Sequence, residues 1–319
     1  MKLLYKLTLF FSLSVALVAC DQSKKNNDAM ENLPSFFIKK GNNYYRKEGN
    51  NQLVISASVA GRVSSLKIDD QELLLTPDFT KTSIWGNAFW TSPQSEWNWP
   101  PSESLDTDPY TVSYENDRLV LTSKVDEKTR YQFVKSYGIN AEKKCISIRY
   151  SIYNRGEVEK NVAPWEVTRL QAGGIAFFPQ GNTESTSGIF YPMPVEHIDG
   201  LTWSTYDVNN IRENHHKMLT DGKEGWIAFT NKGKLLVKEF SDVPVELLVA
   251  GEGEIELFAN TEKTFWEVGQ QGEMTTLAPG QHLNWEVLWY MRTLPENIKA
   301  KAGNPELVSF VRGVLRGDN

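Results

Sequence analysis

Four of the ten tryptophans in this 319-residue chain fall within one short segment, residues 83–101. They are Trp85, Trp90, Trp97 and Trp99. The polar side chains between and beside them are Asn87, Gln94, Glu96 and Asn98. Indole faces can stack on the C–H faces of sugars, and amides and carboxylates can bind sugar hydroxyls. The proline and glycine content predicts a loop rather than a helix or a central strand. We expect this loop to line a ligand site; the alternative is a loop that folds back and fills the core.

A second candidate for chemistry is Glu166, in the segment from Asn161 to Arg169. Glu166 directly follows Trp165, and Arg169 lies three residues further along. A carboxyl group beside apolar bulk can have a raised pKa and act as a proton donor. The alternative is that Glu166 and Arg169 form an ordinary ion pair on the surface.

A third candidate is Glu267, which lies between Trp266 and Val268 in an apolar strand pattern. Because side chains alternate along a strand, Trp266 and Val268 can face a core while Glu267 points the opposite way. We expect Glu267 to face a cleft, where it could accept a proton. The alternative is a solvated face of a sheet.

The sequence lacks the motifs of several other chemistries. It contains no Gly-x-Ser-x-Gly elbow, no phosphate-binding loop and no Gly-x-Gly-x-x-Gly run. The histidines have no metal-binding spacing, and solvated loop positions are expected for them: His197, His215, His216 and His282. We therefore expect no metal and no cofactor. The net charge is -6, and Lys and Arg are scattered, so no nucleic-acid partner is expected.

The elements that must position these residues are predicted to be strands. From about residue 36 to residue 294, short apolar alternating runs are separated by turn signals, and no βαβ rhythm appears. For example, Asn116-Asp117 separates two such runs and predicts a hairpin. This pattern indicates an all-β sandwich or barrel. One helix is predicted at the C-terminus, with Asn304 as its cap, Pro305 at its first position and an apolar stripe along one face.

The N-terminus has the features of a targeting signal. Residues 1–19 combine a basic start with a short apolar run, and they end in Leu17-Val18-Ala19-Cys20, which resembles the lipobox of bacterial lipoproteins. The resemblance implies cleavage before Cys20 and lipidation of that residue. Residues 20–33 are then a flexible polar tether, and residues 34–319 form the folded domain. Cys145 is the one cysteine left, within an alternating strand pattern, and we expect a structural thiol.

The quoted residues resemble galactose-mutarotase-like domains. Gly61-Arg62-Val63 and the apolar run that follows are similar to the opening hairpin of that fold. The stretch around Glu267, the Pro279-Gly280 turn and residues 285–290 are similar to its last strands, where aldose 1-epimerases carry a general-base Glu. The resemblance implies an all-β, galactose-mutarotase-like antiparallel β-sandwich (supersandwich), here with a short C-terminal helix. It also implies that Glu267 is the base.

The Trp-rich loop and the run Ala163-Pro164-Trp165-Glu166 more specifically resemble an uncharacterised family of secreted bacterial proteins with that fold. One departure concerns the acid. Aldose epimerases carry a His in a His-Pro-Tyr-like motif, whereas the comparable stretch here has no His. Glu166 would have to replace that His as the acid.

Together these features predict a lipid-anchored protein of the bacterial cell envelope, on the periplasmic or outer-surface side, with a carbohydrate ligand. Glu267 and Glu166 are the candidate catalytic residues, either of an aldose-1-epimerase-like reaction or as a glycosidase pair. The candidate substrate-binding residues are Arg62, Asn87, Trp97, Trp99, Trp165 and Arg169. Two alternatives stay open: a non-catalytic glycan binder that stacks sugars on its tryptophans, and a structural envelope protein.

Overall fold

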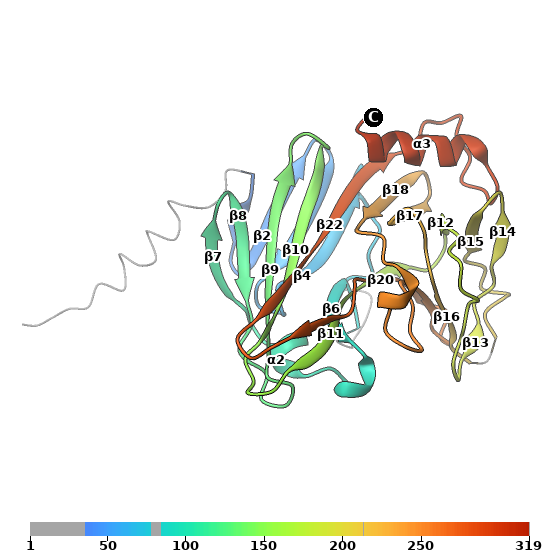
Figure 1. Cartoon of the computed structure of the whole chain (residues 1–319). Coiled ribbons are helices and arrows are strands. Elements are labelled where there is room, and N and C mark those ends of the chain that lie inside the picture. The colour runs from blue at the N-terminus through green and yellow to red at the C-terminus, as the bar shows by residue number, and fades with distance from the viewer. Residues whose placement is uncertain (1–35, 78–83, 213, 319) are drawn as a thin grey trace, which may run out of the picture.

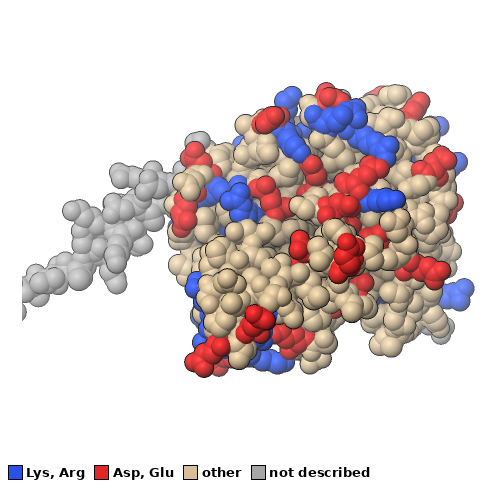
Figure 2. Space-filling model, in the orientation of Figure 1, with Lys and Arg blue, Asp and Glu red and all other residues tan. Residues whose placement is uncertain are grey.

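The computed structural model describes residues 36–77, 84–212 and 214–318, which form two large β-sheets packed face to face (Figure 1). Cys20 and the predicted signal and tether lie outside these residues. Within them, no helix has both the length and the apolar character that a membrane span requires. The face in Figure 2 carries acidic and basic side chains interspersed with each other.

The first sheet carries the central side chains of the candidate site. Its main path, in spatial order, is β1 (Ile38–Lys40), β2 (Asn43–Glu48), β3 (Asn51–Ser56), β4 (Arg62–Ile68), β6 (Asn87–Ser92), β11 (Lys160–Gln171), β20 (Phe265–Gln271), β19 (Ile255–Ala259), β16 (His216–Thr220) and β13 (Tyr191–Pro192). Beside this path, β5 (Gln71–Glu72) pairs with β4, and β21 (Thr275–Leu277) pairs with β11. All of these pairs are antiparallel except that of β13 with β16.

The second sheet closes the other side of the core. Its described strands, in spatial order, are β14 (Glu196–Ile198), β15 (Leu201–Thr205), β12 (Ile175–Pro179), β17 (Trp226–Asn231), β18 (Lys234–Glu239), β22 (His282–Thr293), β10 (Cys145–Asn154), β9 (Tyr131–Asn140), β8 (Arg118–Thr122) and β7 (Thr111–Glu115). The short helical elements of the described chain are η2 (Gln94–Glu96), α2 (Glu103–Asp106) and η3 (Val245–Leu247). The predicted Asn116-Asp117 hairpin is confirmed as the β7–β8 turn.

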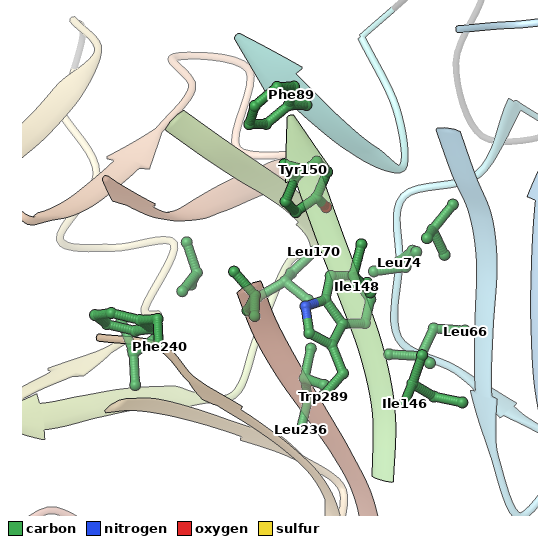
Figure 3. Close-up of a cluster of buried hydrophobic side chains, with 14 of the residues drawn as sticks. Leu66, Leu74, Phe89, Ile146, Ile148, Tyr150, Leu170, Leu236, Phe240 and Trp289 are labelled. Atoms are coloured by element: carbon green, nitrogen blue, oxygen red, sulfur yellow. The ribbon is translucent and has the colours of Figure 1, made fainter. Parts of the chain in front are cut away.

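The main core lies between the two sheets, because each sheet turns one apolar face inward. Phe89 of β6 and Tyr150 of β10 stack there with ring centroids 4.2 Å apart (Figure 3). Trp289 of β22 is fully enclosed in the same cluster, with Leu170 of β11 beside it. This core fixes which face of β6 and β11 is left for a site.

The C-terminal helix α3 (Pro305–Arg316) is confirmed in detail. The Asn304 side chain caps it by accepting a hydrogen bond from the Glu306 backbone N–H at 3.0 Å. Its apolar stripe packs on the second sheet in a cluster with residues such as Leu288 and Tyr290. Cys145 lies in this cluster too, and burial raises the pKa of its thiol to about 12, as befits a structural thiol.

The expectation that the whole Trp-rich segment is a loop is wrong for Asn87–Ser92. These residues form β6, a central strand between β4 and β11. Gly86, with φ 64°, and Pro93 bracket the strand and leave its interior free of both residue types. These two residues therefore mark the ends of the strand. Residues 84–86 before it are irregular, and the part from Pro93 onward runs as loop and short helical turn.

Candidate functional site

The antiparallel register brings four polar or aromatic side chains into one row across the first sheet. Arg169 of β11 lies opposite Glu267 of β20, Glu267 lies opposite Phe258 of β19, and Phe258 lies opposite Lys217 of β16. Because directly opposite residues share a face, this row stands on the side of the sheet away from the second sheet. Glu256 stands on the same face, two residues before Phe258.

Above this row is a pocket of about 490 Å³. Its aromatic lining is Trp90, Trp99, Trp165, Phe190, Phe258 and Phe265. Its charged and polar lining is Gln94, His215, Lys217, Glu256, Asn260, Glu262 and Glu267. The volume and the mixture of aromatic and convergent polar groups are typical of a small-molecule site.

Trp90 is the centre of the aromatic wall. Its ring contacts Trp165 edge-on at 5.1 Å between centroids, and Trp99 edge-on at 5.8 Å. Its indole N–H donates a 2.9 Å hydrogen bond to Asp106, which fixes the ring. The exposed Trp99 is thereby held against a rigid neighbour rather than left free on the loop.

The loop was expected either to line a site or to fold back into the core. Its two tryptophans, Trp97 and Trp99, differ in this respect. Trp97 is buried, packs on Trp90, and donates its N–H to the Thr91 carbonyl at 2.8 Å. It is a plug against the sheet. Trp99 is 55% exposed and lines the pocket.

Glu267 faces this pocket, as strand alternation predicts, while Trp266 and Val268 lie in the core. Its Oε1 accepts a 2.7 Å charge-assisted hydrogen bond from Nε of Arg169. Arg169 is itself buried, with its guanidinium 5.1 Å from the centre of the Trp90 ring. Arg169 therefore holds Glu267 rather than lining the pocket.

Glu256 is the most unusual group in the pocket. It is 2% exposed, and burial, together with the negative charge of Glu267, raises its pKa to about 7, against the opposing effect of Lys217. Its Oε1 lies 3.2 Å from the Lys217 ammonium, whereas its Oε2 has no hydrogen-bond partner in the part of the chain that the structure describes. A carboxyl group in this state can exchange a proton near neutral pH.

Gly269 lies between Glu256 and Trp165. A Cβ at this position would come within 3.3 Å of the Trp165 indole nitrogen and 3.4 Å of the Glu256 Cβ. Among the described residues the Trp165 indole N–H, like the Glu256 Oε2, has no hydrogen-bond partner. Each is thus a buried polar atom that no described residue satisfies.

The structure does not bring Glu166 to this pocket, and the expected Glu267–Glu166 pairing is corrected. Glu166 lies opposite Gln270, three positions along the register from Glu267, so the two carboxyl groups point to opposite faces of the sheet. Glu166 is fully buried between the sheets, 2.7 Å from the Lys238 ammonium. Tyr150 donates to it at 2.5 Å.

Arg62 and Asn87, expected to bind substrate, are also enclosed. The Arg62 guanidinium donates to the Trp85 carbonyl at 3.0 Å and pairs with Asp106 at 3.0 Å. Asn87 donates to Thr168 at 3.1 Å on the inner face of the sheet. Both side chains are wholly buried, so they support the wall and the core rather than contact a pocket ligand.

Several pocket residues were missed from the sequence, notably Glu256, Lys217 and His215. A signal for Glu256 is present, because Glu256, Phe258 and Asn260 alternate with the apolar residues of the same strand. The expectation of solvated histidines is wrong for two of the four. His216 is buried, with Nδ1 2.7 Å from the Pro192 carbonyl, and His215 lines the pocket, whereas His197 and His282 are exposed.

Comparison with solved structures places this architecture among known folds. A galactose mutarotase-like protein from Lactobacillus casei superposes with a TM-score of 0.54 at 13% identity, over 78% of this chain and 100% of that one. A galactose mutarotase related enzyme from Lactobacillus acidophilus gives 0.52 at 9% identity, over 81% and 99%. The chain has the galactose-mutarotase-like fold. No family profile and no curated protein matches the sequence.

A larger protein contains the same architecture. A TPR-domain containing protein from Parabacteroides distasonis superposes with a TM-score of 0.55 at 17% identity, over 82% of this chain. The present chain spans 49% of that protein, about half its length. At these identities the likeness shows the fold alone.

The position of Glu166 generates a stability prediction. Substituting Lys238→Met leaves a buried carboxylate without its cation, which should reduce the free energy of unfolding by about 3–5 kcal/mol. Urea denaturation measures the change. Lys143→Met removes a pair with Glu239 that is partly exposed, and it should cost below about 1 kcal/mol. Equal losses in the two variants would contradict the structural role assigned to Glu166.

Proposed function

We propose that this protein binds a carbohydrate in the pocket on the outer face of the first sheet. The observation that carries the proposal is a single cavity that combines the exposed indole of Trp99 with the carboxyl side chains of Glu256 and Glu267. Sugars have both an apolar surface and polar groups that can contact such a cavity. Their C–H faces stack on aromatic rings, and their hydroxyls both donate and accept hydrogen bonds.

The polar atoms suit hydroxyl groups better than a single charge. A hydroxyl can donate to a carboxylate oxygen and accept from an indole N–H at the same time. The cavity carries carboxyl groups from Glu256, Glu262 and Glu267 against one ammonium, from Lys217, so a strongly anionic ligand is disfavoured. The fold is consistent with this proposal, since solved proteins with this fold include ones described as galactose mutarotase-like.

Substitution of Trp99 tests this site. Trp99→Ala should weaken binding of a recognised sugar roughly 10-fold, about 1.4 kcal/mol, because the exposed stacking face is lost. Calorimetric titration against a panel of mono- and oligosaccharides measures the affinity. Tyr153→Ala is the matched control, since this partly buried ring stacks on His282 on the second sheet. If no sugar in the panel binds the wild type, the proposal fails.

A second candidate function is catalysis of the aldose-1-epimerase type. It is favoured by Glu267, which lines the pocket, is oriented by Arg169, and matches the general-base position of the resembled epimerases. Such a base would take the proton of the anomeric hydroxyl as the sugar ring opens. Glu166 has no part in this reaction, because it lies in the core.

Catalysis predicts a specific loss of turnover. Glu267→Gln should lower the rate of anomer interconversion by about 10²–10⁴-fold while sugar affinity changes little. Proton NMR of the two anomers, with a sugar shown to bind, measures the rate. Glu286→Gln, an exposed residue of β22, serves as control and should keep the wild-type rate. A wild type that binds sugar without accelerating interconversion would leave the protein a non-catalytic binder.

We also propose that the protein is a lipoprotein, anchored to a membrane through lipid on Cys20. The support is the sequence alone: the apolar run that ends in Leu17-Val18-Ala19-Cys20, followed by a polar stretch. Several acyl chains on one residue give stable anchoring, at about 0.8 kcal/mol for each buried CH₂.

Lipidation predicts where the protein is recovered. Full-length protein expressed in a bacterial host with the lipoprotein pathway should sediment with membranes, and Cys20→Ser should shift it to the soluble fraction or leave it uncleaved. Immunoblotting of the fractions measures this. Cys145→Ser removes the buried cysteine instead and should not alter the distribution. Cleaved protein that sediments with membranes equally well after Cys20→Ser would refute lipid anchoring.

A further inference from the structure

We propose that Glu256 is the proton donor of the pocket, the acid that acts opposite Glu267 on a bound sugar. The inference rests on the proposed carbohydrate function and on the catalytic form of it. It fills the role that the sequence assigned to Glu166, which the fold keeps in the core. The position of Glu256, the charges around it and its unbonded oxygen support this role.

Position is the first support. Glu256 and Glu267 lie on adjacent antiparallel strands, one diagonal step apart on the same face. Residues in this relation have their Cα atoms roughly 7–8 Å apart, so one ligand in the pocket can lie within reach of both side chains. Both residues line the same pocket.

An unused oxygen is the second support. Glu256 is almost completely buried, its Oε1 faces Lys217, and its Oε2 has no partner among the described residues. A buried polar atom without a partner is costly unless a ligand or a proton satisfies it. The Trp165 indole nitrogen, which also has no partner among the described residues, lies close to Gly269 on the strand between Glu256 and Trp165.

The charges around Glu256 are mixed. Lys217 of β16 favours the charged form, whereas burial and the carboxylates of Glu267 on β20 and Glu252, just before β19, favour the protonated form. Burial is the largest of these effects, and the pKa of Glu256 is raised to about 7. Glu256 can therefore hold a proton at neutral pH and release it to an oxygen that gains negative charge as its bond to carbon breaks.

The step is balanced by two proton transfers. Glu256 gives its proton to the ring oxygen as the bond between that oxygen and the anomeric carbon breaks. Glu267 takes the proton of the anomeric hydroxyl, and the C=O bond of the open sugar forms. After rotation about the adjacent C–C bond, ring closure returns one proton to each side. Both residues regain their starting states, and no other reactant is consumed.

The proton on Glu256 can be tested without any ligand. Between about pH 4.5 and pH 7 the folded protein keeps this proton while the unfolded chain has lost it, so this group's contribution to stability falls as pH rises through that window. Glu256→Gln removes the titration. The melting temperature of Glu256→Gln minus that of the wild type should therefore increase from about pH 5 to pH 7.5. Glu246→Gln, an exposed control, should give a constant difference.

The same variants then test the chemistry. Glu256→Gln should retain sugar affinity, lower the interconversion rate by about 10²–10⁴-fold, and abolish the decline in rate above about pH 7. Lys217→Met provides a second variant should Glu256→Gln fold poorly. It removes the charge that opposes protonation, so the decline in rate should move to higher pH.

The outcomes separate this inference from the proposed function. Absence of sugar binding to the wild type, seen by calorimetry, defeats the function and the inference together. Sugar binding without turnover, turnover that survives Glu256→Gln, or a melting-temperature difference that is flat with pH each overturns Glu256 as the proton donor. Sugar binding without turnover, and turnover that survives Glu256→Gln, both leave carbohydrate binding intact.

Discussion

The antiparallel register of β11, β20 and β19 is the constraint on which the site depends. Along these strands alternate residues face either the core or the pocket, so one register places Glu267, Arg169 and Glu256 on the open face and Glu166, Trp266 and Val268 on the closed one. A slip by one residue would exchange these two sets. The apolar face cannot leave the core without a large loss of hydrophobic stabilisation, so the polar face is fixed as a consequence.

Each face of β11 carries a buried carboxylate–cation pair, and the two pairs serve different purposes. Glu166 and Lys238 join the two sheets across the core, with Tyr150 and Gln270 completing the hydrogen bonds of the carboxylate. Such a pair contributes little net stability but is costly to break. Arg169 and Glu267 instead form a pair whose carboxylate reaches the pocket. Trp90 of β6 lies over the Arg169 guanidinium, 5.1 Å from its ring centre, and both members of this second pair are buried.

Much of the architecture could be predicted from the sequence, since alternation and turn residues are local signals. The strand pattern, the capped C-terminal helix and the outward direction of Glu267 all follow from them. The failures have a common cause, which is burial by segments distant in the chain. The burial of Arg62 and Glu166 could not be predicted, because their ion-pair partners, Asp106 and Lys238, are distant in the sequence. Glu256 was missed because its importance depends on neighbours from three other strands, although its alternating pattern is visible. β6 was missed because Gly86 and Pro93 were taken as breaks within a loop rather than as the ends of a strand.

The most direct test of the central claim, that the outer face of the first sheet binds a sugar, is a crystal structure of the protein with a saccharide selected by calorimetry. We expect a sugar ring stacked on Trp99, with hydroxyl or ring oxygens within hydrogen-bond distance of Glu256, Glu267 and the Trp165 indole nitrogen. A saccharide bound elsewhere on the molecule, with this pocket occupied by solvent alone, would contradict it.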